Sequence, residues 1–293
     1  MTGSSTFTLT DSLVSTEWLS ENLGKPRLLV FDCTCILTPD PKTILRADSG
    51  RPGYEVVHIP GAGFLDITGD LSDPNSALRF TMPAPERLAV LFGAAGIGDG
   101  SAVVLYAKDN PSWATRMWWM LRVAGFDNAA VLDGGLAKWQ AEGHPVEAGS
   151  NTLPAATLTP HPRPELVVDA QGVTDALAHG ASVINALSRD QHRGDGMNYG
   201  RPGHISGSIN VPSAELIDPE TKEFKPEPEI RDLLESAGAL QAAEAVPYCG
   251  GGIAASITAF WLHRLGHPRI RLYDNSLSEW AADPSLPMQT GSL

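Results

Sequence analysis

Cysteine and long apolar runs are scarce in this sequence. The three cysteines, Cys33, Cys35 and Cys249, cannot build a disulfide framework, and such sparing use of thiols is typical of a reducing compartment. No apolar run is long enough to span a bilayer. The polar segment from Met1 to Thr16 lacks the basic and apolar regions of a secretory signal. We therefore expect a cytoplasmic protein that does not contact a membrane.

Positive charge is also in short supply. Lys and Arg number 21 against 34 Asp and Glu, a net charge of −13, which repels nucleic acid at long range. A nucleic-acid partner is therefore not expected, whereas a small anionic substrate is still compatible, because a local pocket can oppose the global field. The length of 293 residues exceeds the usual size of one hydrophobic core and indicates two domains.

The segment from His144 to Pro164 separates the two expected domains. It contains five prolines and has little hydrophobic periodicity, which is typical of a linker. We therefore predict a first domain over residues 1–143, a linker over 144–164 and a second domain over 165–293.

The two halves repeat one order of elements. The first half predicts a strand (28–31), a long polar loop, the sequence HIPGAGF (58–64), a helix (84–95), a strand (102–107), an aromatic helix (114–125) and a strand (129–135). The second half predicts the matching strand (182–187), HISGSIN (204–210), a helix (229–236), a strand (243–249), a helix (253–266) and a strand (269–276).

Short apolar strands that alternate with amphipathic helices are typical of parallel sheets flanked by helices on both faces. The predicted fold class is therefore α/β, with two tandem copies of one domain. Pro247 lacks the N–H group that a buried strand uses for pairing, so we expect its strand to pair irregularly.

Cys249 stands where the carboxyl end of a strand runs into a helix, which is where open parallel sheets bind ligands. Gly250, Gly251 and Gly252 follow, and Ile253 and Ala254 lead into the helix. Glycines let successive N–H groups turn inward, and the helix N-terminus adds positive potential, so we expect a depressed pKa for the Cys249 thiol. A lone cysteine after a strand is usually a buried small hydrophobe. Packing gives no reason, however, for three glycines beside one sulfur.

The run CGGGIAA (249–255) resembles the active-site loop of the rhodanese and 3-mercaptopyruvate sulfurtransferase family. GHISGSIN (203–210) is similar to the family's GHIPGAxN, and LYDNSLSEW (272–280) to its YDGSWxEW. HIPGAGF, WWMLRVAGF and LDGGLAKW resemble first-domain signatures. The resemblance covers at least residues 28–280 and implies two rhodanese-like domains, of which only the second has a nucleophile, since Ala107 stands near the matching place in the first.

The resemblance implies sulfur transfer through a persulfide on Cys249, without a metal or organic cofactor. The thiolate takes sulfur from a small anionic donor, the loop amides hold the persulfide, and an acceptor such as cyanide or a small or protein thiol removes that sulfur. A thioredoxin-like reductant is a further candidate acceptor.

The neutral loop favours 3-mercaptopyruvate over thiosulfate as the donor, because relatives that prefer thiosulfate usually carry cations just after the cysteine. The serine of a Ser/His/Asp relay found in the mercaptopyruvate group is replaced by Gly251, although His58 and Asp48 stand near the matching first-domain positions. The resemblance also implies arginines that hold the donor's anionic group. The candidates are Arg193, Arg201 and Arg189, and surface arginines on a polar loop are otherwise merely solvated.

Two alternative functions match the sequence less well. Phosphatases that resemble rhodanese need an arginine six residues after the cysteine, where Ala255 stands. A regulatory sulfur-carrier or interaction module is the other alternative; a non-catalytic interaction module would lack the nucleophile, as the first half does and the second does not. Cys33-Thr34-Cys35 lacks partner ligands for a metal, and we expect it to be structural. His58 and His204 are expected to shape turns or the domain interface, and Trp118 and Trp119 to lie in the core.

Overall fold

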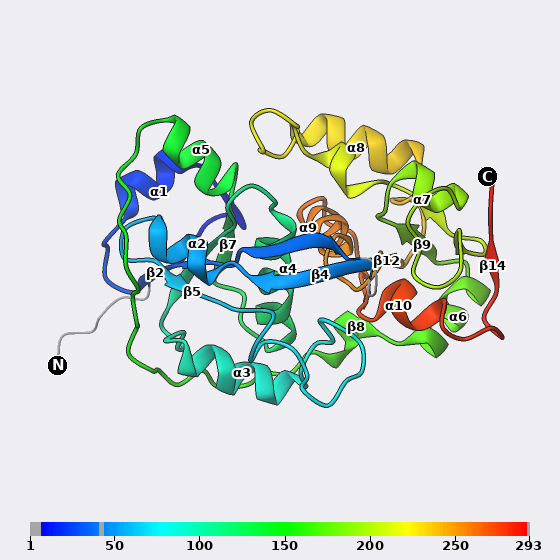
Figure 1. Cartoon of the computed structure of the whole chain (residues 1–293), viewed down its shortest axis with the longest axis horizontal. Helices are drawn as coiled ribbons and strands as arrows, with labels where there is room; N and C mark the ends of the chain where they lie inside the picture. Colours follow the sequence, from blue (N-terminus) through cyan, green and yellow to red (C-terminus); the bar gives the residue numbers. More distant parts are fainter. Residues whose placement is uncertain (1–6, 41–43, 292–293) are drawn as a thin grey trace.

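The computed structural model describes residues 7–40 and 44–291, with the backbone alone at Ile44. Residues 1–6, part of the segment examined for a secretory signal, lie outside them. The chain forms two α/β units that lie side by side, the first on the left in Figure 1 and the second on the right. No helix or strand occurs between residues 142 and 163. This stretch runs around the first unit and is tied to it by bonds such as Ala156 N–H to the Gly93 carbonyl (2.9 Å) and His161 N–H to the Ala124 carbonyl (3.0 Å).

The first unit contains a five-stranded parallel sheet in the order β1-β7-β6-β2-β5. Its strands are β1 (Leu13–Val14), β2 (Leu28–Asp32), β5 (Gly63–Phe64), β6 (Ala102–Tyr106) and β7 (Ala129–Leu132). Its helices are α1 (Thr16–Asn22), α2 (Arg51–Val56), α3 (Pro85–Ala94), α4 (Ser112–Val123) and α5 (Gly135–Ala141).

Alternate residues of the central strands pack into two separate cores, as expected for a sheet that is covered on both faces. Val104 and Tyr106 pack with α1 and α5 on one face. Val103 and Leu105 pack with α3 and α4 on the other. Because both faces are buried, β6 is apolar throughout, which is why the sequence predicted it so clearly.

The second unit repeats this arrangement. Its strands are β8 (Val167–Val168), β9 (Ser182–Asn185), β10 (His204–Ile205), β11 (Ile209–Asn210), β12 (Ala245–Tyr248), β13 (Leu272–Tyr273) and β14 (Met288–Gln289). Its helices are α6 (Ala170–Ala178), α7 (Arg189–Arg193), α8 (Glu227–Ser236), α9 (Ala255–Arg264) and α10 (Ser276–Trp280), with short 3₁₀ turns at Pro164–Leu166 and Ser213–Leu216. β10 and β14 form a small antiparallel pair. The fold class predicted from the sequence is confirmed.

Pro247 interrupts the second sheet at its middle. On one side β12 pairs with β9 in regular register, Pro247 opposite Ile184. On the other side only the bridge between Ala245 and Ile270 connects β12 to the segment that leads into β13. Leu105, at the matching place in β6, pairs with Val131 of β7. The missing N–H of Pro247 therefore accounts for the split into β11-β9-β12 and β13-β8.

The loop expected after the first strand is not a simple loop, and that prediction was wrong. It contains the antiparallel hairpin of β3 (Cys35–Asp40) and β4 (Ile44–Ser49). The hairpin lies outside both sheets and has no continuous apolar face. Because it contains prolines and charged residues in place of an apolar pattern, its strands could not be predicted from the sequence. Figure 1 shows β4 extending from the first unit toward the end of β12.

Helices α4 and α9, which follow matching strands, pack against each other at the centre of the molecule. The Thr115 and Ser256 hydroxyls lie 2.7 Å apart across this contact. Trp118 of α4 meets Phe260 of α9 edge to face, with ring centroids 4.9 Å apart, and both tryptophans of the pair 118–119 are buried in the core as predicted. One apolar core thus runs through both units and fixes them together.

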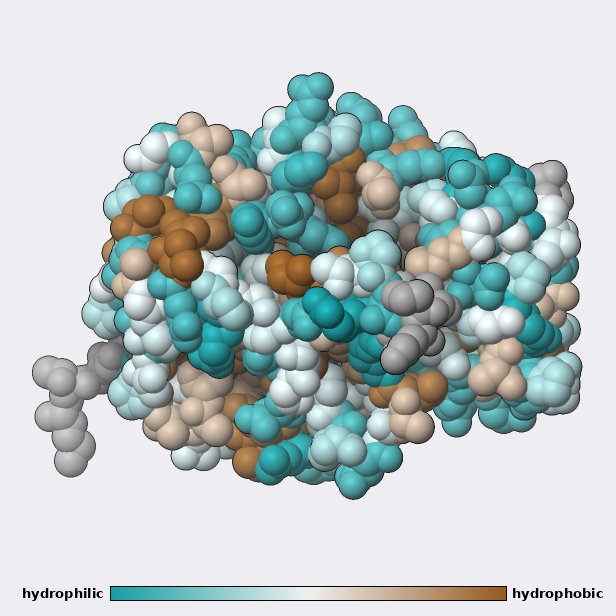
Figure 2. All heavy atoms as spheres, in the orientation of Figure 1, coloured by the Kyte–Doolittle hydropathy of each residue, from teal (hydrophilic) through white to brown (hydrophobic). Residues whose placement is uncertain are grey.

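The surface is mostly hydrophilic in the view of Figure 2, and its hydrophobic residues lie in small separate patches. Large apolar side chains that remain exposed include Ile36, Leu37, Val56 and Val90. Within residues 7–40 and 44–291, no helix has the length and hydrophobicity of a membrane span.

Candidate active site

Cys249 follows the last residue of β12, and its side chain is buried. Its carbonyl accepts the Leu277 N–H (3.1 Å), just as the Ala107 carbonyl after β6 accepts the Leu136 N–H (3.0 Å). The two positions are therefore equivalent in the two units. The first unit has an alanine where the second has its thiol.

The loop after Cys249 is held from behind by two serines. The Ser276 hydroxyl accepts the N–H groups of Cys249 (3.0 Å) and Gly252 (3.2 Å). Ser278 donates both its N–H (2.9 Å) and its hydroxyl (2.7 Å) to the Gly250 carbonyl. Ser276 has a positive φ of 52°, a conformation that costs about 1–3 kcal/mol for a residue with a side chain. The segment that carries both serines therefore fixes the shape of the glycine loop through four hydrogen bonds.

This anchoring leaves several backbone N–H groups of the loop unused. In the described part of the chain, the N–H groups of Gly250, Gly251, Ile253 and Ala254 donate to no protein acceptor. They lie between the thiol and the N-terminus of α9, where successive N–H groups favour an anion.

The three glycines of the loop have different surroundings. A Cβ on Gly250 would lie 2.0–2.3 Å from the ring and hydroxyl of Tyr199. Gly252 has φ of +73°, and a Cβ there would lie 2.5 Å from the Asp274 carbonyl. A Cβ on Gly251 would meet nothing nearer than 3.7 Å. Two of the three positions therefore require glycine, and Gly251 is the one with room for a side chain.

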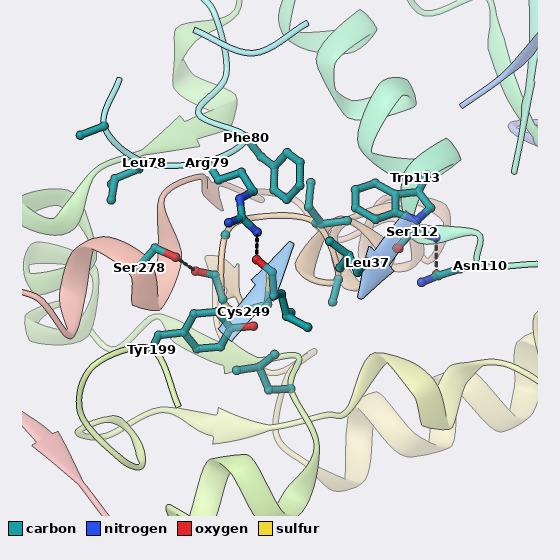
Figure 3. Close-up of a pocket in the computed structure, with 17 residues that line it drawn as sticks. Leu37, Leu78, Arg79, Phe80, Asn110, Ser112, Trp113, Tyr199, Cys249 and Ser278 are labelled. Atoms are coloured by element: carbon teal, nitrogen blue, oxygen red, sulfur yellow. Dashed lines mark hydrogen bonds between the residues drawn. The ribbon is translucent and has the colours of Figure 1, made fainter. Parts of the chain in front are cut away.

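Cys249 opens into a cavity of about 410 Å³ between the two units. Both units line it: the hairpin and the segment 77–80 belong to the first, the glycine loop and Tyr199 to the second (Figure 3). Apolar walls come from Leu37, Leu45, Leu78, Phe80, Trp113, Leu187 and Ile253. Only a few polar groups reach this space, which is typical of small-molecule sites.

Arg79 is the one cation among the described residues that line the cavity. Its guanidinium donates to the Leu45 carbonyl on β4 and lies 5.9 Å from the centre of the Phe80 ring. In Figure 3, Arg79 and Tyr199 lie on opposite sides of Cys249. Sequence reasoning missed Arg79, because it stands in an irregular segment of the first unit, far from the cysteine and without a motif to mark it.

The structure places none of the three predicted arginines at this cavity. Arg189 pairs with Glu215 (2.5 Å), and Arg193 pairs with Asp190 and Asp195 on the surface. Arg201 donates to the main-chain carbonyls of residues 280, 281, 283 and 286, where it holds the C-terminal segment. Local acceptors already engage the guanidinium of each arginine. None of the three is therefore placed to bind the anionic group of a sulfur donor in the cavity.

His58 and Asp48 do not reach the cavity either. His58 is fully buried; its Nδ1 bonds the Tyr54 carbonyl (2.8 Å) and its Nε2 lies 3.0 Å from Glu147. Asp48 is an exposed partner of Arg46 on β4. The structure therefore does not assemble a relay from these two residues.

His204 packs within the second unit. Its ring stacks on that of His192 with centroids 3.5 Å apart, and its Nδ1 bonds the His192 carbonyl (2.6 Å). Burial lowers the pKa of both imidazoles, that of His192 to about 4. His204 therefore has a packing role within the second unit.

Cys33 and Cys35 are buried thiols near the foot of the hairpin. Burial raises the pKa of Cys33 far above its usual range and that of Cys35 to about 12. No group of His, Cys, Asp and Glu side chains among the described residues is arranged to hold a metal ion. Both thiols therefore fit a packing role.

Comparison with known proteins agrees with this geometry. The model of the rhodanese-like domain matches residues 15–142 and 180–283, so the chain belongs to the rhodanese-like domain family. It is 33% identical to the 3-mercaptopyruvate sulfurtransferase of Escherichia coli, over 94% of this chain and 97% of that protein. It is 31% identical to thiosulfate/3-mercaptopyruvate sulfurtransferase 2 of Arabidopsis thaliana, over 95% and 86%.

Solved structures give the same result. The crystal structure of SseA from Escherichia coli, described as a 3-mercaptopyruvate sulfotransferase, superimposes with a TM-score of 0.76 at 30% identity, over 92% of this chain and all of that one. The predicted family and the prediction that the chain is a sulfurtransferase are confirmed.

Proposed function

We propose that Cys249 carries sulfur as a persulfide between a small anionic donor and a thiol or cyanide acceptor. The observation that supports this most directly is the position of Cys249, whose thiol opens into the cavity beside a row of free N–H groups. Nucleophilic catalysis by a thiol needs access to substrate and stabilisation of negative charge on sulfur. Both are available here.

The reaction has two steps. In the first, the Cys249 thiolate attacks the transferable sulfur of the donor; a sulfur–sulfur bond forms as the donor's own bond to that sulfur breaks, and sulfite or pyruvate leaves. In the second, the acceptor attacks the outer sulfur, and Cys249 leaves as the thiolate. The free N–H groups of the loop hold the negative charge of the thiolate and of the persulfide.

Arg79 is proposed to hold the anionic end of the donor, the role that the sequence suggested for Arg193, Arg201 or Arg189. A charge-assisted hydrogen bond contributes about 1.5–3 kcal/mol, or roughly one to two factors of ten in capture. One cation beside neutral glycines suits one carboxylate better than the dianion thiosulfate. The proposed donor is therefore 3-mercaptopyruvate, with thiosulfate the second candidate.

The persulfide is tested with Cys249→Ser, which is nearly isosteric and cannot form a sulfur–sulfur bond. Incubation with donor in the absence of acceptor should add the mass of one sulfur atom to the wild type, on the peptide that contains Cys249. The variant should gain no mass and show no turnover. Cys35→Ser is the matched control and should retain both. Turnover by Cys249→Ser would overturn the mechanism.

The anion site is tested with Arg79→Met, which keeps most of the side-chain length and removes the charge. We expect kcat/KM for 3-mercaptopyruvate to fall roughly 10- to 100-fold. Arg193→Ala, which removes an exposed arginine paired with two aspartates, is the control and should have little effect. The opposite ranking of the two variants would assign the anion to Arg193.

A further inference from the structure

The donor step with 3-mercaptopyruvate needs a proton that thiosulfate does not need. When the carbon–sulfur bond breaks, its electron pair passes to the carbon, and the strongly basic enolate of pyruvate must be protonated. Sulfite, the fragment that leaves from thiosulfate, is a weak base and departs unaided. A site built for mercaptopyruvate therefore requires a proton donor close to Cys249.

The residues that line the cavity offer few candidates. Among those described, the titratable groups are Arg79, Cys249 and Tyr199. Arg79 is a guanidinium, which does not give up its proton in proteins, and Cys249 is the nucleophile. The Ser278 hydroxyl donates to the Gly250 carbonyl, and aliphatic hydroxyls are far weaker acids than a phenol. The phenol of Tyr199 is the candidate that remains.

Tyr199 has the geometry for this task. The hydroxyl end of its ring lies directly on Gly250, the residue after the nucleophile, and points into the cavity (Figure 3). In the described part of the chain, no hydrogen bond occupies its hydroxyl group. Burial, and next the negative charge of Cys249, raise its pKa above the usual range, so the phenol keeps its proton at neutral pH.

We propose that Tyr199 is a further catalytic residue, whose hydroxyl protonates the pyruvate enolate as Cys249 takes the sulfur of 3-mercaptopyruvate. This proposal rests on the function proposed above. In this chain Gly251 has no side chain, and His58 and Asp48 lie away from the cavity. The proposal therefore assigns the protonation step of the mercaptopyruvate reaction to the phenol of Tyr199.

The atoms balance without another reactant. The Cys249 thiolate forms the new bond to the substrate sulfur, and the carbon–sulfur bond gives its electrons to the enolate. Tyr199 gives a proton to the enolate, which becomes pyruvate, and the resulting phenolate takes the proton that the substrate thiol carried into the persulfide. Tyrosine is thereby restored, and the persulfide is left as the anion beside the loop N–H groups.

The test is Tyr199→Phe, which removes the hydroxyl and keeps the ring against Gly250. Persulfide formation on Cys249 is followed by rapid mixing with one donor at a time and by mass analysis, without acceptor. We expect the rate from 3-mercaptopyruvate to fall roughly 100-fold or more, while the rate from thiosulfate stays close to that of the wild type. Tyr54→Phe, which removes a hydroxyl bonded to the Ala62 carbonyl in the first unit, is the matched control and should not discriminate between the donors.

The outcomes separate this proposal from the one it rests on. Equal losses with both donors would mean that the hydroxyl only supports the loop, and no loss with either would mean that it takes no part; each result overturns the role of Tyr199 and leaves the Cys249 persulfide intact. A wild type that forms the persulfide from thiosulfate alone would overturn both the proposed donor and the role of Tyr199.

Discussion

The guanidinium of Arg116, from α4 of the first unit, lies 2.5 Å from a carboxylate oxygen of Asp274 in the second, and both side chains are buried. Arg116 also donates to the Phe80 carbonyl (2.8 Å), and Asp274 accepts the Met82 N–H (2.7 Å). This ion pair lies directly under Gly252. It therefore links the domain interface to the glycine loop after Cys249.

Loss of Arg116 is predicted to be costly, because it leaves the Asp274 carboxylate buried without its partner. Arg116→Met should lower the free energy of unfolding by about 3–5 kcal/mol, measured by urea titration. The control Arg46→Ala removes the exposed pair with Asp48 and should cost at most about 1 kcal/mol. Equal costs would show that the buried pair does not stabilise the interface.

The glycine loop is predicted to tolerate side chains unequally. Gly250→Ala places its Cβ against the Tyr199 ring and should destabilise the protein by about 1–3 kcal/mol. Gly251→Ala has space and should change stability by no more than about 0.5 kcal/mol. The measurement is thermal unfolding of the two variants. A larger loss of stability for Gly251→Ala than for Gly250→Ala would contradict the described packing.

A cation introduced into this loop should alter donor choice, and the structure identifies where to introduce it. Because Gly250 is covered by Tyr199, the substitution belongs at Gly251, which has open space. Gly251→Arg should shift the ratio of kcat/KM values toward thiosulfate, whose two negative charges gain more from a second cation. Gly251→Gln is the uncharged control. An equal shift with both would show that size, and not charge, selects the donor.

The three thiols should differ sharply toward iodoacetamide. A pKa of about 12 for Cys35 leaves roughly one thiolate in ten thousand at pH 8, and Cys33 is shifted in the same direction. Cys249 should therefore be labelled first, and turnover should fall in step with the label, as measured by peptide mass analysis. Labelling of Cys35 at a comparable rate would contradict its burial.

The His192–His204 stack is predicted to weaken the fold in mild acid. The pKa of His192 is about 4 in the folded protein, against 6.5 for an unperturbed imidazole. Between these pH values the folded protein therefore binds fewer protons at His192 than the unfolded chain does. The contribution of His192 is therefore present above pH 6.5 and lost as the pH falls toward 4. His192→Phe, which keeps a ring in the stack, should lose less stability than the wild type between pH 7 and 5 in urea titrations.

The titration of Asp133 affects the design of that experiment. Burial raises the pKa of Asp133 to about 6, which works in the opposite direction, so the variant must be compared with the wild type and not judged alone. His179→Gln alters an exposed histidine and is the matched control. A pH dependence of His192→Phe identical to that of the wild type would refute the prediction.

The sequence by itself determined the repeat, the α/β fold and the position of the proposed nucleophile, Cys249. Strands such as β6 are buried on both faces and appear as apolar runs in the sequence, and the three glycines after Cys249 indicate a tight strand-to-helix turn, in which two positions require glycine. Even the interruption at Pro247 could be predicted, because it depends on the chemistry of one residue. These features are local, so the order of residues encodes them.

Only the tertiary structure decided which side chains meet Cys249. Arg79 and the hairpin reach the cavity because the two units pack together through α4 and α9. The hydrophobic periodicity of the sequence does not show which helices of the two units pack together. Arg189, Arg193 and Arg201 lie closer to Cys249 in the sequence, yet local carboxylates and carbonyls engage each of them. Separation along the chain therefore did not predict separation in space, because the site is formed between domains.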